Sequence, residues 1–593
     1  MPATGSTLSS AHVLTLPDGR ELAITCKDAD GNDVGMFETV QAGVGTLTLA
    51  ARIALSATVS AVFPIDGETT WWTPTSGRAL GPDWGGGSDV RSMLSAPAGA
   101  AVGPLDDAAV VVMAASANVR RCRLVGGVRE EDGTFRLRLS FADIAVEDGA
   151  DAVTRFDVRG ATLAAAMADV TSWWIDQLDG SPAQRAIPPV PDAGREALFS
   201  AWYAMHQNVS AESVELQARL AAEVGLGAVI VDDGWQTTDR NRGFAFCGDW
   251  NVNTDAFPDM AAHVARVQAM GMKYLLWFGA PLIGRNSTAW TEFEDKLLGY
   301  AEGLRAGVFD PRFPEVRALI VERISRAVRE WGVDGLKIDF IDSWAGFEAT
   351  SRAGTDCDTV DEGAERFLDE LLTATRGVRP DVLVEFRQGY IGPRLWRYGT
   401  LLRAGDCPAD AAQNRAATLD VRILAGDRAV HADMLMWHPD ASAEAAAAQL
   451  TAVLFAVPQI SVRLDRMSDL HRRVLTFWLG VAARWRGVLQ HGVLATSGAA
   501  ARFTQAWALD ASTRFVVAYA DGLVRVPADD TAELVLVNAR AVEGLIVTGL
   551  VDGPANLVVH DCTGALVSDS AIEIGVGPWW VAVPPQGLAV LTR

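Results

Sequence analysis

The sequence has few of the features that mark nucleic-acid-binding, membrane or secreted proteins. Acidic residues outnumber basic ones by 74 to 51, and the formal net charge is −23. Such a surface does not attract a phosphate backbone or an anionic membrane. No uncharged apolar run reaches the roughly 18–20 residues of a membrane span, and the first residues lack the basic and apolar segments of a secretory signal. We therefore expect a cytoplasmic protein with neither a nucleic acid nor a membrane as partner.

Cysteine is scarce and scattered. The six cysteines form no CxxC pair and no metal-finger spacing, so we expect free thiols in a reducing compartment: Cys26, Cys122, Cys247, Cys357, Cys407 and Cys562. His431, Asp433 and His438 are possible metal ligands, but they alternate along an expected strand instead of forming a set such as H-E-x-x-H. We expect no metal and no other cofactor, and a role for His431 and Asp433 in contacting or supporting a substrate.

The pattern of the chain changes twice along its 593 residues, which suffice for two or three domains. Residues 1–190 alternate short β-like runs with turn clusters, which predicts an N-terminal β-sandwich domain. After a proline-rich linker at 187–195, residues 196–487 alternate apolar strands with segments of helical spacing. Residues 490–593 return to strands alone and predict a C-terminal antiparallel β-sandwich domain. The expected fold is multidomain, with a sandwich on each side of a central catalytic domain.

Eight apolar strands can be placed in the central region. They lie at residues 198–206, 227–235, 273–280, 335–342, 382–389, 401–407, 429–437 and 459–464. Eight strand–helix units over roughly 290 residues fit a (β/α)8 TIM barrel better than an open doubly wound sheet.

Carboxylates, cations and tryptophans recur where these strands end, which is the rim that carries the active site in a barrel. They are Asp232, Asp233, Trp235, Trp277, Lys337, Asp339, Glu385, Arg387, Arg403, Asp406, His431 and Asp433. Acids bind sugar hydroxyls and an indole ring stacks on the C–H face of a sugar, so the mixture points to a small carbohydrate substrate.

Two of the acids suit the pair of carboxyl groups that cleaves a glycosidic bond. Asp339 lies two residues after Lys337 and points the same way, so the lysine favours the ionised form that a nucleophile needs. Asp406 stands between Gly405 and Cys407, a less charged setting that we expect to raise its pKa for acid/base work.

The segments GAVIVDDGW, WGVDGLKID and LLRAGDCPAD resemble motifs of glycoside hydrolase family 36, the α-galactosidase-like family of clan D. The resemblance implies a sandwich–barrel–sandwich plan and a retaining mechanism. It implies that Asp339 is the nucleophile and Asp406 the acid/base. It also implies that Asp232, Asp233 and Lys337 bind sugar hydroxyls, and it favours a homo-oligomer. We add Trp235, Trp277, Arg387, Arg403, His431 and Asp433 to the expected substrate-binding set.

The sequence departs from the family next to the sugar. Trp277-Phe278-Gly279-Ala280-Pro281 stands where well-known bacterial members have Trp-Phe-Glu-Pro-Glu, and 386–390 (FRQGY) stands where they have Cys-Ser-Gly-Gly-Gly. The leading expectation is a retaining exo-α-glycoside hydrolase, and first an α-galactosidase, for which the catalytic pair is better supported than galactose as the substrate. An α-glucoside, an α-N-acetylgalactosaminide or a modified, even anionic, sugar facing Arg387 remains an alternative.

Other interpretations stay open. The acids can cap the helices that follow them, and Arg403 either holds Asp406 or contacts the substrate. The glycine-rich loop around Asp83 and Trp84 is a plain turn or reaches the barrel mouth. For the whole protein the alternatives are a transglycosylase of the raffinose-synthase kind, a non-catalytic sugar-binding protein, and a metal-dependent barrel hydrolase or isomerase.

Overall fold

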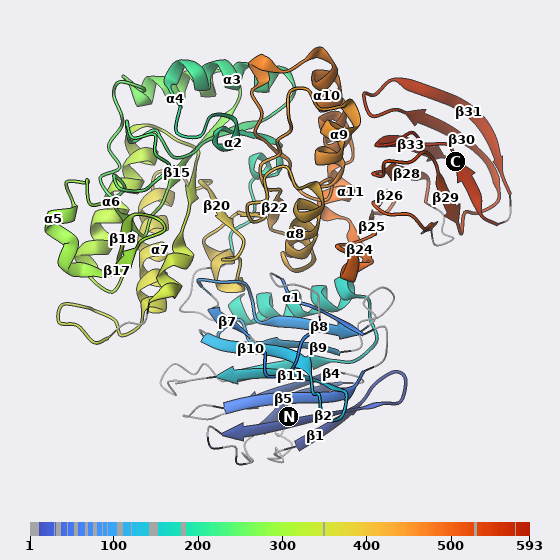
Figure 1. Ribbon diagram of the computed structural model, residues 1–593, viewed down its shortest axis with the longest axis horizontal. Coiled ribbons are helices and arrows are strands. Elements are labelled where there is room, and N and C mark those ends of the chain that lie inside the picture. Colours follow the sequence, from blue (N-terminus) through green and yellow to red (C-terminus); the bar gives the residue numbers. More distant parts are fainter. Residues whose placement is uncertain are drawn as a thin grey trace.

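The computed structural model describes residues 11–593, apart from residues 29, 31, 33–36, 44–45, 52–56, 66–68, 75–79, 86, 92, 104–110, 120, 142–151, 180–185, 348–349, 527–530 and 576. It has three bodies, a sandwich at each end of the chain and a barrel between them, as the sequence predicts (Figure 1). None of the described helices is long and apolar enough to cross a membrane.

The N-terminal sandwich consists of two six-stranded sheets. One has the order β1 (Ala11–Thr15), β2 (Glu21–Asp28), β5 (Ala57–Pro64), β11 (Thr134–Phe141), β10 (Arg121–Val128) and β7 (Ser88–Arg91). The other has the order β3 (Phe37–Gly43), β4 (Thr46–Ala51), β12 (Ala152–Asp157), β9 (Val111–Ala115), β8 (Gly99–Gly103) and β6 (Thr70–Trp72). In β11 every second residue is buried, from Phe135 to Phe141, so one face of the sheet packs into the core.

The central sheet has eight parallel strands, one at each predicted position, although each strand is shorter than predicted. They are β13 (Leu198–Ser200), β14 (Ala228–Val231), β15 (Lys273–Phe278), β19 (Gly335–Ile338), β20 (Leu383–Arg387), β21 (Leu401–Arg403), β22 (Ala429–His431) and β23 (Gln459–Ile460). The order runs from β22 through β21, β20, β19, β15, β14 and β13 to β23. Parallel bridges from His431 to Val457 and from Leu435 to Ile460 join the two edges and close the barrel.

The helices around the barrel follow their strands in sequence. They are α2 (Ala201–Met205), α3 (Ala211–Glu223), α4 (Met260–Gln268), α5 (Trp290–Phe293), α6 (Pro314–Glu330), α7 (Val360–Arg376), α8 (Ala411–Leu424), α9 (Ala443–Thr451), α10 (Asp469–Arg484) and α11 (Arg486–His491). A three-stranded insertion, β16 (Leu282–Ile283), β17 (Leu297–Ala301) and β18 (Ala306–Phe309), lies between β15 and α6.

One helix departs from the predicted pattern. The connection between β20 and β21 holds the short 3₁₀ helix η5 (Pro393–Arg397), and α1 (Leu163–Asp179), from the region predicted as strands, packs against η5 and α8. Trp174 of α1 meets Trp396 edge to face, with ring centroids 6.2 Å apart. Figure 1 shows α1 between the N-terminal sandwich and the barrel. The N-terminal region thus supplies helical cover for the barrel.

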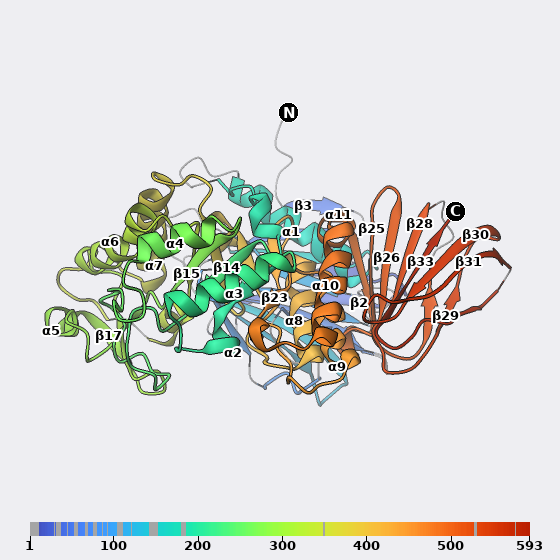
Figure 2. The same cartoon turned by 90° about the horizontal axis from the view of Figure 1, so that it is seen from above.

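The C-terminal sandwich stands beside α10 and α11 (Figure 2). Its larger sheet has the order β24 (Val493–Ser497), β25 (Gln505–Leu509), β26 (Thr513–Ala518), β28 (Glu533–Asn538), β33 (Gly587–Thr592), β30 (Gly553–His560) and β31 (Leu566–Ile574). The smaller has β27 (Leu523–Arg525), β29 (Leu545–Thr548) and β32 (Trp579–Val581). Within these mainly antiparallel sheets, β26 with β28 and β27 with β29 are parallel pairs.

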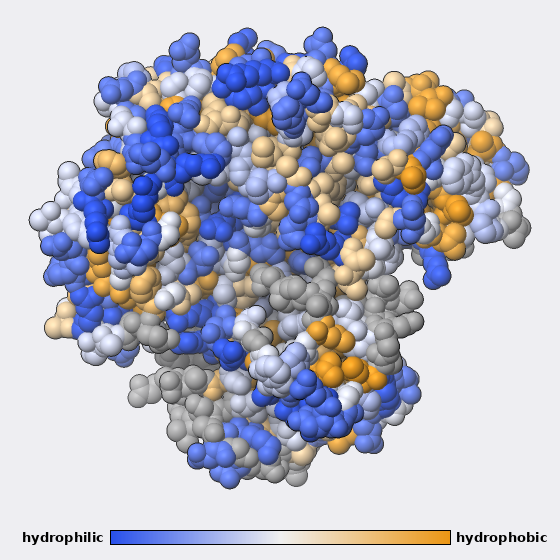
Figure 3. All heavy atoms as spheres, in the orientation of Figure 1, coloured by the Kyte–Doolittle hydropathy of each residue, from blue (hydrophilic) through white to orange (hydrophobic). Residues whose placement is uncertain are grey.

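Apolar side chains join the three bodies. A single buried cluster runs from Trp72 through the barrel to Phe515 in β26. On the surface, the face in Figure 3 is largely polar over the barrel, and apolar side chains gather on the C-terminal sandwich. There the exposed Leu523, Val542, Ile546 and Trp580 border a hollow of about 390 Å³.

Candidate active site

Asp339 follows β19 directly, and its carboxylate accepts four hydrogen bonds. Oδ1 accepts from the Phe340 N–H at 2.8 Å, from Arg387 Nε at 2.7 Å and from the Tyr390 hydroxyl at 2.8 Å. Oδ2 accepts from Trp277 Nε1 at 3.0 Å. The three side-chain donors come from β15, β20 and the segment after β20, so the closed barrel fixes both the place and the orientation of this carboxylate.

The charge of Asp339 is set by the cations around it. Burial alone raises the pKa of this carboxyl, but the guanidinium of Arg387 and the ammonium of Lys337 outweigh burial and hold the pKa well below its usual value. Arg387 is itself fixed, because its guanidinium lies 5.4 Å from the ring centre of Phe340 and 5.5 Å from that of Tyr390. Asp339 is therefore ionised at neutral pH, as a nucleophile requires.

Asp406 follows β21 and is the more accessible acid, with 53% of its side chain exposed. Arg403 donates from one terminal nitrogen to Asp406 Oδ1 at 2.9 Å. Burial raises the pKa of Asp406, yet Arg403, Lys337 and Arg387 together lower it below its usual value. The sequence-based expectation of a raised pKa is wrong for the free protein, because cations from β19, β20 and β21 converge on this acid.

Arg403 links Asp406 to a buried network beneath it. It binds Asp433 Oδ1 at 2.6 Å and lies 3.5 Å from Glu385 Oε1. The other oxygen of Asp433 accepts from the Cys407 N–H at 2.7 Å and from the Tyr203 hydroxyl at 3.0 Å. Asp433 is fully buried, and burial raises its pKa. Arg403 therefore holds the side chain of Asp406, and Asp433 holds the backbone of the next residue, Cys407.

The two acids after β14 have different environments. Asp232 Oδ2 lies 2.5 Å from Lys337 Nζ, and both side chains are about 95% buried. Asp233 accepts from Gln207 and Gln236, each at 2.7 Å, one on each oxygen. Burial raises the pKa of Asp233 to about 6. Asp233 is thus fully engaged by protein groups, whereas Asp232 forms a buried ion pair with Lys337.

Three other predicted residues are buried. Trp235 is fully buried, and its indole N–H donates to the Trp277 carbonyl at 3.0 Å. Trp277 is also buried, with its own N–H on Asp339. His431 is fully buried, its Nε2 is 2.8 Å from the Gly194 carbonyl, and burial lowers its pKa to about 4. These rings support the site from within, and they do not line its mouth.

Several contacts escaped the sequence analysis. Tyr390 reaches Asp339, Tyr203 reaches Asp433, and Gln207 reaches Asp233. Tyr390 lies in the segment that replaces the family's Cys-Ser-Gly-Gly-Gly, and this departure was its only signal in the sequence. Tyr203 and Gln207, which follow β13, had no signal in the sequence.

The described contacts of Asp83 and Trp84 lie within the N-terminal sandwich. Asp83 pairs with Arg136 at 2.8 Å, and Trp84 Nε1 donates to Glu130 at 3.2 Å. Gly86 of this loop lies outside the described residues. Among the described residues, Pro74 connects the N-terminal sandwich to the segment after β20, because its carbonyl accepts from Gln388 at 2.8 Å.

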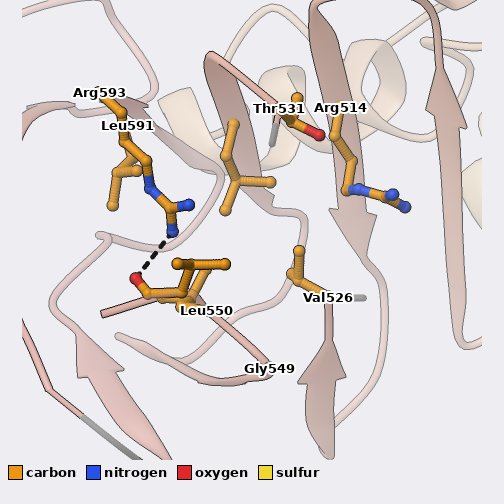
Figure 4. A pocket seen from close by; sticks show the side chains of 9 residues that line it. Arg514, Val526, Thr531, Gly549, Leu550, Leu591 and Arg593 are labelled. Carbon is orange, nitrogen blue, oxygen red and sulfur yellow. Dashed lines mark hydrogen bonds between the residues drawn. The ribbon is translucent and has the colours of Figure 1, made fainter. Parts of the chain in front are cut away.

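Two further features bear on the chemistry. Across the part of the chain that the structure describes, no group of three or more His, Cys, Asp or Glu is arranged to hold a metal. A cavity in the C-terminal sandwich, where Arg593 donates to the Val551 carbonyl at 3.0 Å, has a volume of only about 20 Å³ (Figure 4). That volume accommodates one water and no sugar.

Comparison with known proteins agrees with the barrel motifs. Residues 187–367 match the Melibiase family model. The α-galactosidase AgaA of Geobacillus stearothermophilus is 29% identical over 156 residues, which are 25% of this chain and 21% of the relative. The bifunctional α-galactosidase/sucrose kinase AgaSK of Mediterraneibacter gnavus is 26% identical over 218 residues, 34% of this chain and 22% of the relative. The alignments thus span about a fifth of each relative.

The fold is shared over a longer stretch than the sequence. A variant of the family 36 α-galactosidase AgaA, solved in complex with raffinose, aligns with a TM-score of 0.60 at 15% identity, covering 100% of this chain and 90% of that one. The α-galactosidase of Lactobacillus brevis aligns with a TM-score of 0.63 at 14% identity, covering 100% and 84%. The three-body architecture is therefore that of family 36, and the resemblance seen in the motifs is confirmed.

Proposed function

We propose that this chain, a relative of the α-galactosidases of glycoside hydrolase family 36, is a retaining exo-α-glycoside hydrolase that removes terminal α-galactose. One observation carries the proposal. An ionised, firmly oriented Asp339 shares the barrel rim with an accessible Asp406, and the charge of Asp339 acts on the pKa of Asp406. Two such groups are sufficient for double displacement without a cofactor.

In the first step an oxygen of Asp339 attacks the anomeric carbon. Oδ1 already accepts three hydrogen bonds and Oδ2 accepts one, so Oδ2 is the oxygen with a lone pair to spare. As the carbon–oxygen bond to Asp339 forms, the glycosidic carbon–oxygen bond breaks. The proton of Asp406 passes to the departing oxygen, which leaves as an alcohol.

In the second step Asp406 takes a proton from water, and the resulting hydroxide attacks the anomeric carbon and releases Asp339. The charge of Asp339 raises the pKa of Asp406 in the free protein. When Asp339 becomes an ester this charge is lost, so the pKa of Asp406 falls, which suits its change from acid to base.

The first step needs Asp406 protonated, although its pKa is low in the free protein. The sugar displaces water from this exposed acid, and loss of water favours the uncharged carboxyl. Substrate binding is thus expected to raise the pKa of Asp406 toward the working pH.

The surroundings of Arg387 favour a neutral sugar over an acidic one. Its Nε is paired with Asp339 at 2.7 Å, so its positive charge is already balanced. Asp232, Asp339 and Asp406 at the same rim repel a carboxylate on the substrate. We assign hydroxyl recognition to Asp232 and Lys337, and we assign to Asp233 the role of fixing the segment after β14 that carries Asp232.

The test is turnover of nitrophenyl α-glycosides by the purified protein. We expect the α-galactoside to react far faster than the α-glucoside, and NMR to detect α-galactose as the first product. Asp339→Ala should lose activity by roughly 10⁴-fold or more, and azide should restore turnover with inverted stereochemistry. An active Asp339→Ala protein without azide would refute the nucleophile, and α-glucosides reacting as fast would refute the sugar alone. An added acceptor sugar separates hydrolysis from transfer.

Two further expectations accompany this function. All six cysteines are free and buried, which supports a reducing, cytoplasmic location. A homo-oligomer follows from the family resemblance, and light scattering of the purified protein tests it.

A further inference from the structure

The backbone N–H groups of the two residues that flank Asp406 are both held in place. On its C-terminal side, the Cys407 N–H donates to Asp433 at 2.7 Å. On its N-terminal side, the Gly405 N–H donates to Gln388 Oε1 at 3.2 Å. Asp406 itself is half exposed, and its side chain rests on Arg403. The direction of its carboxylate therefore depends on these two anchored amides.

Gln388 is the anchor that comes from outside the barrel core. Its Nε2 donates to the carbonyl of Pro74, at 2.8 Å, and Pro74 follows strand β6 of the N-terminal sandwich. Its own N–H donates to the Arg403 carbonyl at 2.8 Å. The side-chain amide donates a hydrogen bond to one backbone group and accepts a hydrogen bond from another. Neither a glutamate nor a leucine can do both.

The N-terminal sandwich holds the same region at two more places. The Gly392 N–H donates to the Ser95 carbonyl at 3.0 Å, in the segment that follows Gln388. Trp72 Nε1 donates to Asp420 Oδ1 at 2.7 Å, on α8, the helix that follows Asp406. Both partners in that bond are buried. The chain before and after Asp406 is thus fastened to the sandwich.

We propose that Gln388 is a positioning residue for the acid/base, and that the N-terminal sandwich completes the active site by holding Gln388 through Pro74. The proposal rests on the proposed function of Asp406. A misplacement of about 1 Å at a reacting group costs on the order of 100-fold in rate. Loss of this contact therefore impairs proton transfer without removing either carboxylate.

The readout is the dependence of rate on the leaving group. A poor leaving group, as in an unactivated α-galactoside, needs the proton of Asp406, whereas dinitrophenolate departs without it. In Gln388→Leu we expect kcat for melibiose to fall by roughly 10- to 100-fold. We expect the dinitrophenyl α-galactoside to form the glycosyl-enzyme at the wild-type rate, with azide speeding its release.

Two variants separate the contacts of Gln388. Gln388→Glu keeps an acceptor for Gly405 but sets a carboxylate against the Pro74 carbonyl, so it breaks only the tie to the sandwich. We expect the same selective loss. Trp72→Phe removes the hydrogen bond to Asp420 and keeps an aromatic ring at this position. It tests the attachment of α8 to the N-terminal sandwich without changing residue 388.

The matched control is Gln268→Leu. Gln268 is also half buried and also bridges two groups, the Gly332 carbonyl at 2.9 Å and Asp334 at 2.8 Å, at the opposite end of the barrel. We expect it to lower stability and leave the leaving-group dependence unchanged.

A second measurement needs no turnover. Hydrogen exchange of the backbone at 401–410 should be faster in Gln388→Leu and Gln388→Glu than in the wild type, with the control unchanged. Equal loss on both substrates, no loss on either, or unchanged exchange would overturn the proposal. A wild-type protein without glycosidase activity would instead overturn the proposed function, and the exchange data would still decide whether Gln388 holds the Asp406 segment.

Discussion

At the scale of single residues, the acids of the rim differ in how their charge is compensated. Asp339 is held ionised by Arg387 and Lys337, whereas Asp233 has only amide donors and a pKa raised by burial to about 6. Each difference predicts a distinct response to pH or substitution.

Arg387→Met should move the acid limb of kcat/KM. In the wild type the pKa of Asp339 is lowered, so the ionised nucleophile persists to low pH. Removing the guanidinium raises that pKa, and the acid limb should shift to higher pH by about 1–3 units. The same change lowers stability at neutral pH, because a carboxyl with a depressed pKa stabilises the fold above its unfolded pKa, and the difference from the wild type shrinks as the pH falls.

A pH profile of kcat/KM measures this shift. Arg317→Met is the control, since Arg317 pairs with Asp356 and Glu370 away from the site. An acid limb that stays in place in Arg387→Met would show that Arg387 does not set the charge of Asp339.

Asp233→Asn should destabilise the protein, although it is nearly isosteric. The oxygens of Gln207 and Gln236 accept from the backbone N–H groups of Arg242 and Gly234, so neither amide can turn to accept from the new asparagine. The NH2 group of the asparagine then faces the NH2 group of one of the two glutamines, and this lowers the free energy of unfolding by about 1–3 kcal/mol. We expect a large loss of kcat/KM as well.

Denaturant unfolding at pH 7 measures that cost. Asp239→Asn, in the exposed turn that follows, is the control. Equal stability of Asp233→Asn and the wild type would mean that the two glutamines are not locked.

At the scale of elements, α8 connects helix capping to the acid/base. Asp410 caps the helix by accepting from the Gln413 N–H at 2.9 Å. In the first turn Asn414 binds both the N–H and the carbonyl of Asp433, each at 3.0 Å, and Asp433 holds Cys407. Fraying of the first turn of α8 would therefore loosen the segment that carries Asp406.

Asp410→Ala should lower the free energy of unfolding by about 1 kcal/mol and reduce kcat on poor leaving groups. Asp410→Ser, which keeps a capping oxygen, should restore both. Thermal unfolding and melibiose turnover measure the two effects. If alanine and serine behave alike, the cap has no influence on the site.

The barrel strands were predictable because parallel strands buried on both faces read as short apolar runs, such as Ala228–Val231 and Gly335–Ile338. Helix α1 was not, because Leu163–Asp179 has no acidic residue in its first turn and no basic residue in its last turn, and it follows a run of strands. Its role as cover for η5 depends on tertiary packing.

The candidate site was predictable as a set of residues but not as a set of contacts. Strand-end position identified Asp339 and Asp406. The pKa of Asp406 is lowered first by Arg403 and then by Lys337 and Arg387, which lie on other strands and meet it only in the closed barrel. The tie between Pro74 and Gln388 spans 314 positions in the chain, and no local pattern encodes it.

At the scale of the whole molecule, the barrel and the C-terminal sandwich share a core. Trp485, just after α10, is buried, donates to Glu533 at 2.7 Å and meets Phe515 edge to face at 5.7 Å. The two bodies should therefore unfold together.

Trp485→Ala should cost about 3–5 kcal/mol and separate the unfolding of the C-terminal sandwich from that of the barrel. Calorimetry should show two transitions in place of one, and limited proteolysis should release the C-terminal fragment. Trp485→Phe keeps the packing and should retain a single transition. One transition in both variants would contradict a shared core.

The burial of the thiols has a practical consequence. Every cysteine is at most 8% exposed, and burial raises the pKa of Cys26 and Cys357 to about 11. Maleimides react with an accessible thiolate, so we expect the native cysteines to be labelled very little. A cysteine placed at Trp84, which is 72% exposed, would carry a single dye on the N-terminal sandwich. Its fluorescence could then follow that sandwich in solution while the barrel turns over substrate, with all six native thiols left in place.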